Sequence, residues 1–160
     1  MIRRLVVLWL LIALPFWLTA ATGGPGGETL PVPGAVVGRL LPHGAYHPVY
    51  IVILAGAILT LLRLRSTTAS RVVHRLAVAL LIAQAAAIVG MVGEEIAVLQ
   101  NGGLSAGKDV FKEPLHMASA LVTEPALIVS QVLLIGITIA AIWSMRAEQR
   151  LAATPRDIGA

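Results

Sequence analysis

The stretch that decides the fold is residues 112–146, KEPLHMASALVTEPALIVSQVLLIGITIAAIWSMR, which is apolar over most of its length. About 20 such residues are enough for a helix to cross a bilayer. On a helix with ~100° per residue, its polar positions fall within roughly 60° of one another. These positions are Glu113, His116, Glu124, Gln131 and Thr138, and Ala120 lies on the same face. The stretch therefore predicts a membrane helix with one polar face, and we expect function to involve that face.

Composition supports the same class for the whole chain. Of its 160 residues, 58% are hydrophobic and 12% are charged, and the mean hydropathy is +0.87. Soluble proteins average about 25% charged residues, so a bilayer is the expected environment. The length suits one membrane domain, residues 1–160, without a separate soluble catalytic domain. The chain has no cysteine, which excludes disulfides and thiolate metal sites.

The predicted fold is an all-α integral membrane protein with a bundle of four transmembrane helices. The apolar runs place these spans at about residues 2–21, 48–65, 72–95 and 114–145. Pro48 is favoured as the first residue of the second span. The outer loops are then 22–47 and 96–113, and the cytoplasmic segments are the linker 66–71 and the tail 146–160.

The first segment fits two interpretations. Arg3, Arg4 and the following apolar run, with small residues near Ala21, resemble a cleavable signal peptide, which would leave three spans. Alternatively, Trp9 and Trp17 lie where interfacial aromatic residues would anchor both ends of an uncleaved helix. Pro15 would kink such a helix in its outer half.

Charge distribution predicts the orientation. Segments 1–4, 63–75 and 146–160 would share one side of the membrane, and they hold nine of the twelve basic residues. Arginine-rich segments remain in the cytoplasm, so we expect a multi-pass protein of the cytoplasmic membrane with both termini inside. Membrane orientation therefore accounts for the positions of the basic residues, and no nucleic-acid partner is expected.

Carboxylates and histidines gather at the opposite, outer side. When the spans are counted outward from the arginine-rich side, three carboxylates fall at the same depth, at the edge of the hydrocarbon. Glu113 and the histidines lie somewhat further out. The candidate metal ligands are Glu94, Glu95, Glu113, His116 and Glu124, with His43 and His47 as possible outer contributors. The Glu113-x-x-His116 pair has the spacing used in helical carboxylate metal sites. A divalent cation is the cofactor this set would hold.

Other interpretations of this outer group remain open. Glu124 would be a buried protonatable group in a proton-coupled or cation-coupled transporter. The acids would instead pair with Lys108, Lys112 and Arg39, or face water. They would also suit a surface that docks a larger membrane partner.

Small residues predict how the helices pack. Ala83, Ala87 and Gly90 recur on one face of the third span, where small side chains let helix backbones approach closely in lipid. Gln131 is expected in the same interior, bonded to Gln84 or to a backbone carbonyl. No histidine lies in the middle of a span, so haem held between two helices is not expected.

No catalytic or nucleotide-binding motif is present in the sequence, which favours a non-enzymatic protein. The leading hypothesis is an accessory or scaffold subunit of a membrane complex, whose partners are the lipid bilayer and other membrane subunits or further copies of itself. The alternative is a small cation or metal transporter, or a metal-binding membrane protein, that uses the outer Glu/His cluster. A metalloenzyme at the outer leaflet is a third, weaker hypothesis.

Overall fold

The computed structural model describes residues 1–22, 43–106 and 108–153, and its regular elements there are all helices. The all-α prediction is therefore confirmed for this part of the chain. Three long helices are present, α4 (His43–Thr67), α5 (Arg71–Gln100) and α6 (Pro114–Ala153). The chain begins with α1 (Ile2–Leu8), a π-helical turn η1 (Trp9–Ala13) and α2 (Leu14–Thr22), and the short 3₁₀ turns η2 (Gly103–Ser105) and η3 (Lys108–Lys112) join α5 to α6.

Three helices are long and apolar enough to cross a membrane, over Gly44–Thr67, Arg71–Gln100 and Pro114–Arg150. They correspond to three of the four predicted spans. The largest difference is at the end of α6, which runs to Ala153 and not to residue 145. α4 also begins earlier than predicted, at His43, five residues before Pro48. A proline this close to a helix start disturbs only the first turn, so the helix extends outward past it. Most of the predicted loop 22–47 lies outside the described residues.

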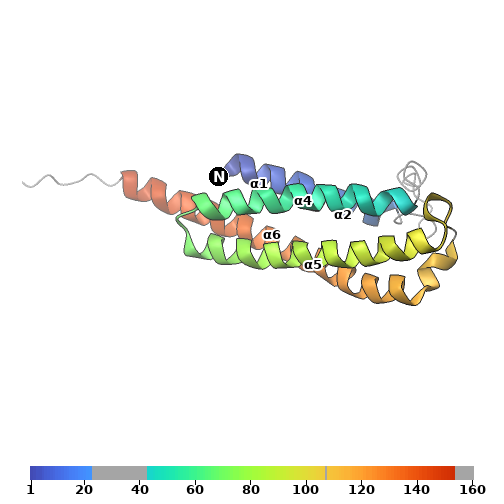
Figure 1. The fold of residues 1–160 in the computed structure, drawn as a ribbon. Helices are drawn as coiled ribbons and strands as arrows, with labels where there is room; N and C mark the ends of the chain where they lie inside the picture. Colours follow the sequence, from blue (N-terminus) through green and yellow to red (C-terminus); the bar gives the residue numbers. More distant parts are fainter. Residues whose placement is uncertain (23–42, 107, 154–160) are drawn as a thin grey trace, which may run out of the picture.

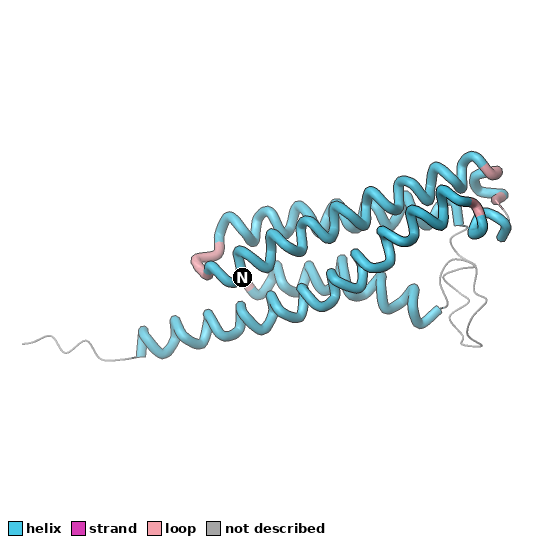
Figure 2. Tube along the Cα trace, turned by 90° about the horizontal axis from the view of Figure 1, so that it is seen from below, coloured by secondary structure: helices cyan, strands magenta, loops and turns pink. Residues whose placement is uncertain are grey.

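The long helices run side by side along one direction (Figures 1 and 2). α4 and α5 are antiparallel and are joined by a short turn, and α6 packs along α5. The N-terminus lies near the α4–α5 turn (Figure 1). We call this the arginine-rich end, comprising residues 1–4, 63–75 and 146–150. The other end, with Glu94, Glu95, Asp109 and Glu113, is the acidic end.

Two glycines bring α5 and α6 into close contact. A Cβ atom added at Gly90 would lie 2.9 Å from both the Ser119 carbonyl oxygen and the Thr123 backbone nitrogen. One added at Gly93 would lie 3.0 Å from the Ser119 Cβ. Glycine is therefore needed for this approach, as in other membrane helix pairs. The predicted packing residues Ala83, Ala87 and Gly90 are all buried in the structure.

Interior polar groups pair differently from the expected Gln84–Gln131 contact. Gln84 Nε2 donates to Ser130 Oγ at 2.7 Å. Gln131 is buried, and its Nε2 lies 3.4 Å from the carbonyl oxygens of Ile12 and of Leu127. Because α6 turns about 100° per residue, adjacent Ser130 and Gln131 point to different neighbours, α5 and the N-terminal segment.

The N-terminal segment joins the apolar core through Leu5, Leu8 and Ile12. Trp9 Nε1 also donates to Thr138 Oγ1 of α6 at 3.0 Å. Pro15 cannot donate a backbone hydrogen bond, and the helix adapts with the π-helical turn just before it. Helical structure then continues as α2.

Candidate metal centre

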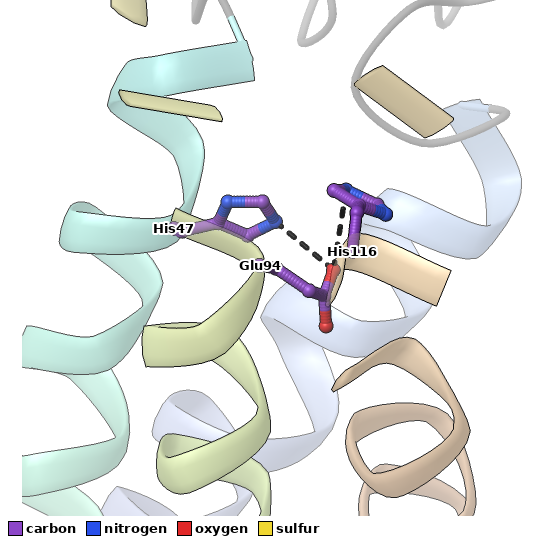
Figure 3. A group of neighbouring side chains, drawn as sticks. All are labelled: His47, Glu94 and His116. Atoms are coloured by element: carbon purple, nitrogen blue, oxygen red, sulfur yellow. Dashed lines mark ion pairs between the residues drawn. The ribbon is translucent and has the colours of Figure 1, made fainter. Parts of the chain in front are cut away.

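His47, Glu94 and His116 meet at the acidic end, and each comes from a different long helix (Figure 3). All three are buried, with exposed fractions of 2%, 8% and 5%. One potential ligand atom from each residue lies within 4.8 Å of the others. Two imidazoles and one carboxylate therefore converge on a single point between α4, α5 and α6.

The two distances that involve Glu94 are close to those around a metal ion. His47 Nε2 lies 3.2 Å from Glu94 Oε2. His116 Nε2 lies 3.8 Å from the same oxygen. Ligand atoms around tetrahedral zinc, with bonds of about 2.1 Å, are about 3.4 Å apart. Shifts of a few tenths of an ångström would bring these pairs to that spacing.

Two further side chains contact the group, Thr123 through a hydrogen bond and Glu95 at ion-pair distance. Glu95 Oε2 lies 3.4 Å from His47 Nδ1, the ring nitrogen that faces away from Glu94. Thr123 Oγ1 donates to Glu94 Oε1 at 2.5 Å, which leaves Oε2 for the imidazoles. Metal-binding histidines and carboxylates in proteins carry outer partners of this kind, which fix the histidine tautomer and the carboxylate orientation.

Local structure explains how His116 reaches the site. The Glu113 carboxylate accepts hydrogen bonds from the backbone N–H groups of Leu115 at 2.7 Å and of His116 at 3.1 Å. This is the bonding pattern of a helix N-cap, which satisfies the first N–H groups of α6. His116 is thereby held in the first turn of α6, facing Glu94.

Aromatic rings enclose the two imidazoles. The Tyr46 ring contacts the His47 ring edge to face at 5.5 Å, and Phe111 contacts His116 in the same way at 5.3 Å. The loop that carries Phe111 is anchored by Val110, which packs against Ala97 and is 3% exposed. These contacts hold both imidazoles in place, and their ring centroids lie 6.0 Å apart.

The other predicted site residues have different positions. Glu124 is exposed, which agrees with the interpretation that these acids face water and not with that of a buried protonatable group. The buried polar face of α6 runs instead through His116, Thr123 and Ser130 at seven-residue spacing, and Glu124 is rotated about 100° from Thr123. Glu113 is engaged as the helix cap. The side chain of His43 lies outside the described residues.

Among the expected basic partners, the described one, Lys112, does not pair with the buried acids. Lys112 pairs with Asp109 at 3.0 Å on the surface. Arg39 and the side chain of Lys108 lie outside the described residues. Within the described part of the chain, the ion-pair partners of Glu94 are the two histidines. A buried carboxylate is costly unless a positive charge compensates it, and a cation or an imidazolium would do so.

Sequence reasoning missed one member of this network, Thr123, and ranked His47 only as an outer contributor. Thr123 follows His116 by seven residues, a spacing that places both on one helix face and was available in the sequence. Pro48 favours a helix start at that residue, which places His47 in the preceding loop.

No protein-family model, curated protein or solved structure matches this chain. The chemistry of the site is therefore argued from its geometry.

Proposed function

We propose that this chain is a membrane protein that binds one divalent transition-metal ion through His47, Glu94 and His116. The observation that carries the proposal is the convergence of three buried ligand atoms, from three helices, within 4.8 Å. Imidazole together with carboxylate suits zinc, and also iron or manganese. The outer contacts of Glu95 and Thr123 support the same conclusion, because metal ligands are oriented by such partners.

Three protein ligands leave a fourth position on a tetrahedral metal for water or another small ligand. The bound cation would also compensate the buried charge of Glu94. We propose that the acidic end faces the exterior of the cytoplasmic membrane, because arginine-rich segments favour the cytoplasm. The ion would then enter from the outer side, as expected for a metal-binding or metal-transporting protein.

We also propose that residues 2–22 form a fourth span, with both termini in the cytoplasm. The hydrogen bond from Trp9 to Thr138 and the contact of Gln131 with the Ile12 carbonyl support this, because they tie the segment to α6. The accessory or scaffold role stays a prediction, since no contact with another chain bears on it.

Metal content tests the proposed function. Protein purified in mild detergent is loaded with zinc, freed of excess metal and measured by elemental analysis. We expect about one zinc per wild-type chain and a loss of that zinc in Glu94→Gln and His116→Gln. Glu124→Gln is the matched control, since it removes an exposed carboxylate of α6 outside the group, and it should retain the metal.

A purely structural His–Glu network predicts a different result. In that case the wild-type protein would hold no more zinc than Glu94→Gln, and a chelator would leave its unfolding temperature unchanged. Either finding would reject metal binding. Under our proposal, the chelator lowers the unfolding temperature of the wild type and has no effect on Glu94→Gln, because binding to the folded state alone stabilises it.

A further inference from the structure

A hollow with a volume of about 620 Å³ lies at the arginine-rich end, between the start of the chain, the end of α4 and α6. Its lining divides into two kinds. Ile2, Leu64 and Met145 supply apolar surface, whereas Arg3, Arg4 and Thr67 supply guanidinium and hydroxyl groups. The metal centre is at the opposite end of the bundle, so this is a separate feature.

We propose that this hollow binds the headgroup of an anionic phospholipid. Arginine is well suited to phosphate because its planar fork donates two parallel hydrogen bonds. The apolar part of the lining suits the first carbons of the acyl chains. The candidate span of α4 ends at Thr67, so the hollow sits where a bilayer changes from hydrocarbon to headgroups. A volume of 300–1,000 Å³ is typical of small-molecule sites.

The arginines are arranged for this task. Arg4 Nη1 donates to the Arg63 carbonyl oxygen at 3.0 Å and to the Thr67 hydroxyl. These bonds hold one edge of the guanidinium against α4, and its other N–H groups remain for a ligand. Arg3 is exposed beside it. Among the described residues, no carboxylate lines the hollow.

Neighbouring groups extend the positive surface. A second hollow of about 220 Å³ shares Thr68 with the first and is lined by Arg71, His74 and Arg75. Basic clusters beside membrane helices attract anionic lipids, each arginine contributing about 1 kcal/mol. A soluble phosphate would use the arginines alone and would gain nothing from Ile2, Leu64 and Met145, which favours a lipid.

Native mass spectrometry tests this site with the full chain in detergent, titrated with phosphatidylglycerol or phosphatidylcholine. We expect wild-type protein to retain phosphatidylglycerol in preference to phosphatidylcholine. Arg3→Gln should weaken phosphatidylglycerol binding about fivefold, the effect of about one arginine. The matched control is Arg65→Gln, which removes an exposed arginine of the same end that lines neither hollow, and its binding should be near wild type.

Three outcomes would overturn the proposal. Equal retention of the two lipids would show that charge is not recognised. Equal weakening by Arg3→Gln and Arg65→Gln would show diffuse attraction without a site. Competition by glycerol 3-phosphate at the same concentration as the lipid would identify a soluble phosphate ligand. Arg4→Gln should weaken phosphatidylglycerol binding more than Arg3→Gln does. If Arg4→Gln also lowers the stability of the protein, the result for Arg3→Gln alone tests the site.

Discussion

Replacing Gly90 with alanine should both separate α5 from α6 and disturb the candidate metal centre. The added Cβ would lie 2.9 Å from the Ser119 carbonyl oxygen and from the Thr123 backbone nitrogen. Backbone atoms cannot rotate away, so the helices must move apart. The Cβ would also collide with Thr123 Oγ1, which donates the hydrogen bond to Glu94.

The expected cost follows from these contacts. Overpacking at a close helix contact costs about 1–3 kcal/mol. Loss of a hydrogen bond to a carboxylate costs a further 1.5–3 kcal/mol or so. Alanine is a better helix former than glycine and returns about 1 kcal/mol. The net loss of stability should therefore be about 1.5–5 kcal/mol.

Thermal unfolding in detergent, with a chelator present, measures this loss without a contribution from metal. Gly56→Ala is the matched control, because its Cβ would meet only Leu11 Cδ1 at an ordinary 3.5 Å. We expect the Gly56 variant to be equal to the wild type or about 1 kcal/mol more stable. If Gly90→Ala unfolded at the same temperature as Gly56→Ala, the close approach of α5 and α6 would not exist.

Three further predictions follow from the site and the topology. Glu95→Gln should lower zinc affinity about 10–100-fold without abolishing it, because Glu95 acts through His47; an unchanged affinity in a calorimetric titration would remove its orienting role. Zinc affinity should fall as the pH is lowered, because protons compete with the metal for the imidazole nitrogens, and a flat profile would argue against histidine ligands. Reporter proteins fused after Ala160 or inserted near Thr67 should give cytoplasmic signals, and an exterior signal from either position would reverse the orientation.

The helical class and the three long spans were predictable because apolar run length alone determines whether a helix can cross a bilayer. Helix ends were harder to predict. Pro48 favoured a start at that residue, but the structure continues the helix outward to His43. That extension places His47 in a buried helix and not in a loop, which the position of Pro48 in the sequence does not indicate.

The sequence indicates which end of the bundle holds the candidate site, but not which side chains meet there. Counting residues along each predicted span places Glu94, Glu95 and Glu124 at the same depth in the membrane. The hydrogen bond between Glu94 and Thr123, the residue before Glu124, agrees with this depth. The depth of a residue in the membrane does not determine which side of the helix its side chain is on, however. The packing of α5 against Ser119 and Thr123 determines this side and leaves Glu124 on the outside. Tertiary contacts of this kind do not follow from the periodicity of a single helix.

The contact between His47 and both acids of α5 also bears on how the protein is assembled. α4 precedes α5 in the chain, so its imidazole is present when Glu94 and Glu95 are synthesised. We expect His47 to pair with these acids within the α4–α5 hairpin as it enters the bilayer, where an unpaired carboxylate would be costly. Thr123 and His116 arrive afterwards with α6. The last helix is therefore expected to complete a set of contacts that the α4–α5 hairpin has already begun.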